Sequence, residues 1–218
     1  MAEMPYDALI FDFDGVIVDS VELKVAAFAE LYNQRDPAIV DAVTAHQRRH
    51  GGQGRLEKFR HFEEVLRGRP PLTAAALQAL ADDYGRRVED AVVACPGIPG
   101  AEDFLARWHQ KIPLFIASGT LDTELQRIVQ RRGLADYLVR AYGTPPEKHL
   151  RIEELLNTHP YRPQRVVMIG DAITDYDAAQ FNGIGFVGVV APGYPNPFPD
   201  DVRAMADLRS LESFLALG

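Results

Sequence analysis

The chain has 218 residues, which is enough for one large domain or for a core domain that carries a smaller insert. Hydrophobic residues make up 47% and charged residues 25% of it, a composition that is typical of globular proteins and excludes a disordered chain. The formal net charge of −8 argues against binding to nucleic acid through a broad basic surface. A single cysteine, Cys95, allows neither an internal disulfide nor a cysteine zinc site, and we interpret it as a small buried apolar residue.

The sequence contains no stretch with the pattern of a membrane span or a targeting signal. The N-terminal apolar run covers only residues 8–11, whereas a spanning helix needs about 20 apolar residues. No basic segment precedes that run, as a secretory signal would require. We therefore expect a cytoplasmic protein that does not act at a membrane.

Short apolar runs alternate with amphipathic segments over most of the chain. Runs that are apolar throughout are typical of strands covered on both faces of a sheet. They predict strands at residues 8–11, 113–117, 166–169 and 185–190. Apolar residues at a spacing of about 3.6 predict helices at residues 101–110, 121–132, 147–157 and 175–181. This alternation indicates an α/β fold with a doubly wound, Rossmann-like parallel sheet.

One long stretch interrupts the alternation. Between residues 20 and 93 no convincing strand is found, and the segments there have the pattern of helices, at 21–32, 37–49, 55–67 and 73–92. Proline and glycine mark a linker at residues 95–97, where the strand–helix pattern returns. We therefore predict a core domain of residues 1–19 and 94–218, with a helical cap (the helical insert, residues 20–93) inserted after the first strand.

Polar residues stand next to the predicted strand ends. In open α/β sheets, ligands bind at the carboxyl ends of the strands. All of these polar residues are therefore expected on one edge of the sheet. They are Asp12 and Asp14 after the first strand, Ser118 and Gly119 after the second, Lys148 at a helix start, and Asp171 and Asp175 after the third strand.

The carboxylates among them suggest a metal site. Asp12 and Asp14 lean to the same side of an extended chain, and two carboxylates so close repel each other unless a cation or a shared proton intervenes. A D-x-D pair by itself is equally typical of a turn or a helix cap. With Asp171 as a third carboxylate, the oxygen ligands favour a hard divalent ion that keeps some of its waters, which suits Mg²⁺.

Phosphoryl transfer is the chemistry that uses such a set. The charge of a phosphate dianion must be neutralised before a nucleophile approaches, and Mg²⁺ and Lys148 can do so while the Ser118 hydroxyl holds a phosphoryl oxygen. One aspartate can then attack phosphorus, and a second can protonate the leaving oxygen and later activate water. The sequence therefore predicts an enzyme that acts on a small phosphorylated metabolite.

Four motifs resemble, in order and spacing, those of the haloacid dehalogenase-like (HAD) superfamily. They are DFDGV at residues 12–16, Ser118, Lys148, and GDAITD at residues 170–175. The chain is most similar to the phosphatase branch with a helical cap between the first two motifs, which includes phosphoglycolate phosphatase and β-phosphoglucomutase. The resemblance covers nearly the whole chain and implies a Rossmann-like core, a cap and Mg²⁺ as cofactor.

The resemblance also implies roles in catalysis. Asp12 is then the nucleophile and Asp14 the acid and base, while Ser118, Gly119 and Lys148 bind the phosphoryl group. Dehalogenase members lack the second aspartate of the first motif. The presence of Asp14 therefore implies a reaction of the phosphatase type.

For the metal, the resemblance implies a site built from the two ends of the motif set. Asp12, the backbone carbonyl of Asp14 and Asp171 would hold Mg²⁺. Asp175 would support either Lys148 or the metal.

The helical insert contains a glycine-rich loop, residues 50–54, that runs into a predicted helix start. Such a loop offers free backbone N–H groups and the positive end of a helix dipole. Arg55 and Lys58 add positive charge on one helical face, because they are three residues apart. With Gly52, they could bind an anionic or hydroxyl-rich leaving group. An ordinary flexible loop with a solvated helix start would have the same pattern.

Other polar residues of the insert give weaker signals. Lys24 lies on the first helix after Asp14, where we expect it to face the cleft and bind substrate. Members similar to β-phosphoglucomutase carry a histidine at the matching place, which counts against a mutase. His46, His50 and His61 are too irregularly spaced for a metal motif on one helix, and we expect surface or capping roles for them.

The sequence thus predicts a Mg²⁺-dependent phosphatase that hydrolyses a sugar phosphate, a sugar-acid phosphate or a phosphoglycolate-like ester through an aspartyl-phosphate intermediate. The alternative at the same site is a phosphomutase of the β-phosphoglucomutase type. Phosphonate cleavage is a weaker alternative, because it would require a reactive lysine in the cap. A phospho-accepting receiver module would carry its aspartate on a later strand, and a catalytically silent binding protein would lack one of the charged motif residues.

Overall fold

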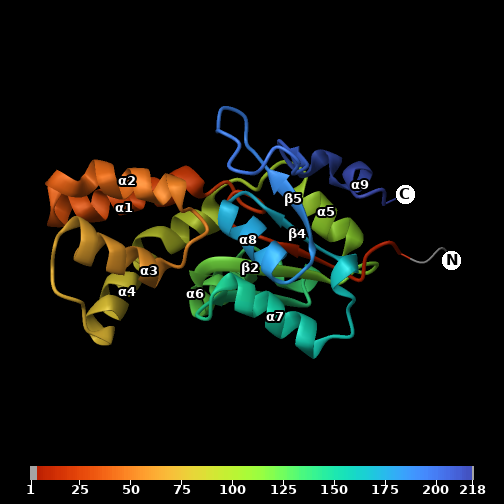
Figure 1. The fold of residues 1–218 in the computed structure, drawn as a ribbon, viewed down its shortest axis with the longest axis horizontal. Coiled ribbons are helices and arrows are strands. Elements are labelled where there is room, and N and C mark those ends of the chain that lie inside the picture. Colours follow the sequence, from red (N-terminus) through yellow and green to blue (C-terminus); the bar gives the residue numbers. More distant parts are fainter. Residues whose placement is uncertain (1–3, 218) are drawn as a thin grey trace.

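The computed structural model describes residues 4–217, which contain a six-stranded parallel sheet (Figure 1). The strand order is β3-β2-β1-β4-β5-β6, which is the order of a Rossmann sheet, so the prediction of a doubly wound α/β fold is confirmed. The strands are β1 (Ala8–Phe11), β2 (Leu114–Leu121), β3 (Arg140–Thr144), β4 (Val166–Gly170), β5 (Gly185–Val189) and β6 (Ala204–Met205).

The four predicted strands are present; β1 has the predicted bounds, and the other three have shifted ends. β2 continues to Leu121 instead of ending at residue 117, β4 includes Gly170, and β5 ends at Val189. The edge strands β3 and β6 are missing from the prediction. β3 has no continuous apolar run because Arg140 begins it and a glycine interrupts it, and β6 has only two residues.

Helices cover both faces of the sheet, as the apolar strands require. One face packs against α7 and α8 in a cluster that includes Ile10 and Phe115. The other face packs against α5, α6 and α9 in a larger cluster that includes Leu9 and Ile116. These helices are α5 (Ala101–Trp108), α6 (Asp122–Arg131), α7 (Lys148–Thr158), α8 (Ile173–Phe181) and α9 (Leu211–Phe214). Short 3-10 helices occur at Pro37–Ile39, Ala135–Tyr137, Pro163–Arg165 and Leu208–Ser210.

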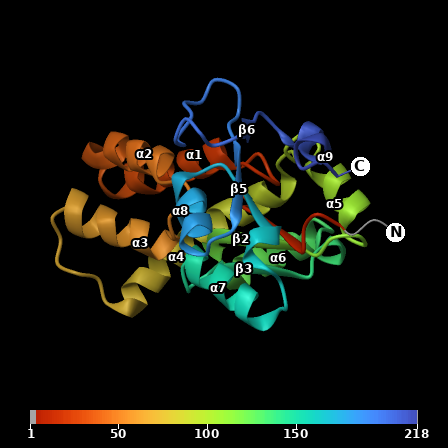
Figure 2. The ribbon, with the colours of Figure 1, turned by 45° about the vertical axis from the view of Figure 1, so that its right-hand side comes forward.

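The helical insert lies to one side of the sheet in both views (Figures 1 and 2). It contains α1 (Val21–Arg35), α2 (Val40–Arg49), α3 (Arg55–Arg60), a π-helix (His61–Leu66) and α4 (Ala74–Ala94). The segment 55–67 is therefore not one α-helix as predicted, because it changes to π geometry at His61. The rings of Phe28, Phe59 and Tyr84 contact one another and join α1, α3 and α4.

The insert and the sheet are packed together. Buried apolar residues of both parts form one continuous cluster, so the domain boundaries at residues 19/20 and 93/94 stay a prediction. Cys95, at the return to the sheet, is half-buried rather than buried, and its thiol donates to Val92 O at 3.2 Å. Within residues 4–217, no helix combines the length and the apolar character needed to cross a membrane.

Candidate active site

The residues that follow β1 and β4 meet where the strand order of the sheet reverses. Open α/β sheets bind ligands at such a switch point, because neighbouring strands lead their connections to opposite faces there. Asp12 directly follows β1, and its backbone N–H donates to Ile169 O at 2.8 Å. Asp171 directly follows β4. The backbone pairing of the two strands therefore sets these carboxylates side by side.

Lys148, the first residue of α7, reaches the same point. Its Nζ donates a hydrogen bond to Asp175 Oδ1 and lies 3.0 Å from Asp12 Oδ1, the latter an ion pair without good hydrogen-bond direction. The other oxygen of Asp175 accepts the backbone N–H of Ala172 at 3.1 Å. Burial disfavours the charged amine, but Asp12 and Asp175 outweigh it and raise the pKa of Lys148. Lys148 is therefore a fixed cation beside Asp12, and Asp175 holds it there.

Asp12, Asp171 and Asp175 form a carboxylate cluster with oxygens within 4.8 Å of one another. Burial, and then the charge of Asp175, raise the pKa of Asp12 to about 7. Burial and the charge of Asp12 raise the pKa of Asp171. Such carboxylates ionise together only next to positive charge.

This donor set fits a hard divalent cation, because all its ligands are anionic oxygens. Gly15, with φ of +80°, makes room for the Asp171 carboxylate, since a Cβ at this position would stand 2.2 Å from Asp171 Oδ2. Both oxygens of Asp175 already accept hydrogen bonds, so Asp12 and Asp171 are the carboxylates best placed to bind the metal.

Asp14 is held by groups from the sheet and from the insert. Lys24 Nζ donates to Asp14 Oδ2 at 2.5 Å, and the Ser20 hydroxyl donates to Oδ1 at 2.5 Å. The Thr120 hydroxyl bridges Asp14 and Lys24: it donates to Asp14 Oδ2 at 3.3 Å and accepts from Lys24 Nζ at 2.9 Å. Burial alone would raise the pKa of Asp14, but Lys24 and these hydrogen bonds lower it. Asp14 is therefore a carboxylate in this arrangement, the form that accepts a proton.

Ser118 and Gly119 lie near the end of β2, at the same sheet edge. Ser118 is buried, and its hydroxyl accepts the backbone N–H of Thr120 at 3.1 Å, which leaves its own proton free for a phosphoryl oxygen. Gly119 lines the cavity described below. On the opposite side, Gly52 of the insert packs so closely on the sheet edge that a Cβ there would stand 2.0 Å from Thr174 Oγ1. The glycine-rich loop thus closes directly over the site.

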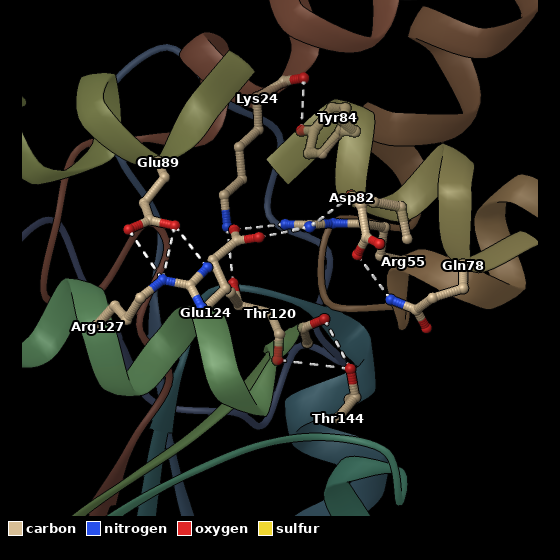
Figure 3. A network of polar contacts seen from close by, with 12 residues as sticks. Lys24, Arg55, Gln78, Asp82, Tyr84, Glu89, Thr120, Glu124, Arg127 and Thr144 are labelled. Atoms are coloured by element: carbon tan, nitrogen blue, oxygen red, sulfur yellow. Dashed lines mark hydrogen bonds and ion pairs between the residues drawn. The ribbon is translucent and has the colours of Figure 1, made fainter. Parts of the chain in front are cut away.

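Arg55 lies in a different environment from the one expected for a free substrate-binding group. Its two terminal nitrogens donate to the two carboxylate oxygens of Glu124 on α6, each at 2.6 Å, and both side chains are 4% exposed (Figure 3). The guanidinium also stacks on the Tyr84 ring at 4.7 Å. Burial disfavours its charge, but the bonds to Glu124 raise the pKa of Arg55. Arg55 lines the cavity while it joins the insert to the sheet.

The two parts of the chain enclose a cavity of about 520 Å³, a size suited to a small ligand. Asp12, Asp14 and Asp171 line it from the sheet side. Other lining residues come from the insert, among them Lys24, Gln47, Gly52, Arg55 and Lys58. The sequence-predicted residues therefore line one cavity, apart from Ser118, Lys148 and Asp175, which are buried at the same sheet edge. Lys148 lines a second pocket, which shares Gly52 with the first.

The histidines of the insert are brought together, which the sequence does not predict. His46 stacks on His61 with ring centroids 4.1 Å apart and lies 4.4 Å from His50. His46 Nε2 also contacts Gln53 Oε1 in the glycine-rich loop at 3.0 Å. Stacked rings do not aim their nitrogens at one point, and the carboxylate cluster is the group with metal-site geometry among residues 4–217.

Three residues with polar roles at the site are absent from the predicted set. Thr120 bridges Lys24 and Asp14, and its place directly after Ser118-Gly119 was the available signal. Glu124 lies with the buried Leu125 and Ile128 on the inner face of α6, and a charge on an apolar face signals a partner. Gln47, buried on α2, gives no such signal.

Comparison with known proteins finds a similar sequence and similar folds. A phosphoglycolate phosphatase from Synechococcus elongatus is 26% identical over 190 residues, which cover 84% of this chain and 82% of that protein. The structure of the HAD-hydrolase YfnB from Bacillus subtilis bound to magnesium has a TM-score of 0.71 at 16% identity and covers 97% of this chain and 99% of its own. That of CbbY from Rhodobacter sphaeroides in complex with phosphate has a TM-score of 0.73 at 18% identity, covering 97% and 100%.

The family model for haloacid dehalogenase-like hydrolases matches residues 6–183. That range contains the four motifs, the helical insert and the switch point between β1 and β4. The chain belongs to the haloacid dehalogenase-like hydrolases.

Proposed function

We propose that the protein is a Mg²⁺-dependent phosphatase that hydrolyses a small phosphomonoester through an aspartyl-phosphate intermediate. The observation that carries this proposal is the Asp12 carboxylate at the switch point, with Lys148 Nζ 3.0 Å away and Asp171 in the same cluster. The name of the Synechococcus relative and the phosphate bound by CbbY support a phosphate ester as substrate. A cytoplasmic location stays a prediction.

In the first step an Asp12 oxygen attacks phosphorus in line, and the bond from phosphorus to the ester oxygen breaks. Lys148 neutralises charge on the phosphoryl group, while Ser118 and Gly119 bind its oxygens. The leaving oxygen takes a proton from Asp14. Because Lys24 favours the carboxylate form of Asp14, the acid must take up its proton and part from Lys24 before this step.

In the second step water attacks the phosphorus of the aspartyl phosphate. The water gives a proton to the Asp14 carboxylate, and the bond from phosphorus to Asp12 breaks. Free phosphate leaves, and Asp12 is a carboxylate again. The lowered pKa of Asp14 suits this step, since the base must be ionised to accept the proton.

Mg²⁺ would be held by Asp12, Asp171 and the backbone carbonyl of Asp14, and it would supply positive charge next to the phosphoryl oxygens. Magnesium bound in the Bacillus subtilis structure supports this choice of ion. Asp175 acts through Lys148 rather than on the metal, because Lys148 and the backbone of Ala172 occupy its oxygens.

The test is phosphate release from a panel of phosphorylated metabolites in the presence of Mg²⁺. Asp12→Asn should abolish turnover without loss of fold, since an amide does not attack phosphorus. Asp201→Asn, an exposed aspartate, is the matched control and should remain active. Acid quench during turnover of a ³²P-labelled ester should yield labelled protein that hydroxylamine cleaves, as expected for an acyl phosphate. Turnover without labelled protein would contradict the intermediate, and isomerised product without net phosphate would indicate a mutase.

A further inference from the structure

Among the cations that line the cavity from the insert, Lys24, Arg55 and Lys58 are buried, and these three differ in their partners. Lys24 and Arg55 each face a carboxylate, as described above. Lys58 does not. Its Nζ donates to the backbone oxygen of Gly51 at 2.8 Å, and within residues 4–217 no carboxylate lies within ion-pair distance of it. Lys58 is only 4% exposed, and a buried ammonium without a counter-charge is costly.

A second buried group on the insert side of the cavity also lacks a partner. Gln47 on α2 is 4% exposed and lines the cavity. Its Oε1 is buried and has no hydrogen-bond partner among the described residues. Buried polar atoms are nearly always paired, so an unpaired one in a cavity wall is explained most simply by a ligand that completes it.

We propose that Lys58 and Gln47 form the leaving-group subsite, and that the substrate is a phosphomonoester whose leaving group carries a second anionic group and a hydroxyl. This inference rests on the proposed function. The anionic group, a carboxylate or a second phosphate, would give Lys58 the partner that Lys24 and Arg55 already have. The hydroxyl would donate to Gln47 Oε1.

The surroundings of Lys58 support an anionic partner. Burial, and then the charge of Lys24, lower the pKa of Lys58 to about 7. The free site therefore disfavours the charged form of Lys58, and a bound anion would favour it. Arg55 is less suited to this role, because Glu124 already binds both its terminal nitrogens. The catalytic residues at the sheet edge take up the phosphoryl group, which leaves the insert side of the cavity for the rest of the substrate.

The experiment compares esters that differ in one group. The ratio of kcat/KM for 2-phosphoglycolate over ethyl phosphate measures recognition of a carboxylate, and that for 1,3-propanediol bisphosphate over propyl phosphate measures recognition of a second phosphate. In the wild type at least one ratio should be high. Lys58→Met should reduce it about 10- to 100-fold, the usual range for a lost contact to a charged group. Lys58→Arg should keep most of it.

Arg60→Met is the matched control, because it removes an exposed cation from the same helix and should leave both ratios unchanged. A ratio measured on one preparation does not depend on the folded fraction, so partial misfolding of Lys58→Met cannot produce the result. For Gln47, Gln47→Leu should reduce the preference for 3-phosphoglycerate over its analogue without the 2-hydroxyl. An unchanged preference would remove Gln47 from the subsite.

Two failures are distinguishable. If neither these esters nor any member of the metabolite panel releases phosphate, the proposed function is overturned and the subsite with it. If they are hydrolysed with ratios near one, or with ratios that survive Lys58→Met, the phosphatase stands and the subsite is overturned.

Discussion

The two sides of the cavity are built in different ways. On the sheet side, Asp12 and Asp171 stand at strand ends, and Lys148, the first residue of a helix, is paired with Asp12 and Asp175. On the insert side, the charges are carried by α1 and α3, with Lys24 and Lys58 inside these helices and Arg55 at the start of α3. Arg55 forms an ion pair with Glu124 of the sheet part, whereas Lys58 donates to a backbone oxygen and has no carboxylate partner among residues 4–217.

This difference fits the proposed roles of the two sides, in which the sheet side binds the phosphoryl group and the insert side binds the leaving group. A phosphoryl group is the same in every phosphomonoester, so the side that binds it can be completed by the backbone pairing of β1 and β4. The leaving group differs between substrates, and the residues that face it must be unpaired until the ligand arrives. A side with paired catalytic charges and a side where Lys58 and Gln47 lack partners fit an enzyme with a fixed reaction and a selected substrate.

The largest expected effect lies on the sheet side, in the removal of the metal. Without a cation, burial and the charge of Asp175 raise the pKa of Asp12, which favours the protonated form that does not attack, and the charge of the phosphoryl group is not neutralised. Excess EDTA should abolish phosphate release, and Mg²⁺ should restore it. Asp171→Ala should raise the Mg²⁺ concentration needed for half-maximal activity, whereas Asp201→Ala should not. Full activity in EDTA would contradict the metal site.

A smaller effect is expected where the two sides join. Arg55 and Glu124 are both 4% exposed, so Arg55→Met leaves a buried carboxylate unpaired and should lower the free energy of unfolding by about 3–5 kcal/mol. The pair Arg127–Glu89 lies at the same junction with Arg127 56% exposed, and Arg127→Met should cost only about 0–1 kcal/mol.

Urea unfolding of the variants measures both free energies. The double variant Arg55→Met/Glu124→Leu should recover most of the loss, because no unpaired charge is then buried. Equal costs for Arg55→Met and Arg127→Met would show that burial of the pair does not matter, and would contradict the comparison.

The same division explains what the sequence predicts. The sheet edge was predictable because apolar runs locate β1, β2 and β4, and the parallel arrangement then brings Asp12, Ser118 and Asp171 to one edge without knowledge of any side-chain packing. β3 was not predicted, because it is an edge strand, and an edge strand can contain polar residues such as Arg140 that interrupt the apolar pattern.

The insert side was predictable only in part. The spacing of Arg55 and Lys58 places both on one helical face, but it does not tell which of them meets a carboxylate. Glu124, the partner of Arg55, lies 69 positions further along the chain in another part of the fold. Likewise, the stack of His46 and His61 depends on how α2 packs on the π-helix, whose irregular geometry no periodic pattern indicates.

The smallest expected effect is a pH dependence of substrate preference on the insert side. Burial and the positive charges of Lys24 and Arg55 lower the pKa of Lys58 to about 7, against the opposing effect of Asp14 and Asp12. Lys58 is therefore charged below that pH and neutral above it. Because kcat/KM reports ionisations of the free enzyme, the preference for the anionic member of an ester pair should fall as the pH rises through about 7.

Ionisations of the catalytic residues change kcat/KM for both esters alike and cancel in the ratio, so the ratio isolates the insert side from the sheet side. Lys58→Arg should remove the pH step while it keeps the preference, because a guanidinium stays charged over this range. A step that persists in Lys58→Arg would have to come from another group, and the next to examine would be the stacked His46, since it contacts the glycine-rich loop through Gln53. A ratio that is flat with pH in the wild type would mean that Lys58 keeps its charge throughout, as it would if the free site already held an anion.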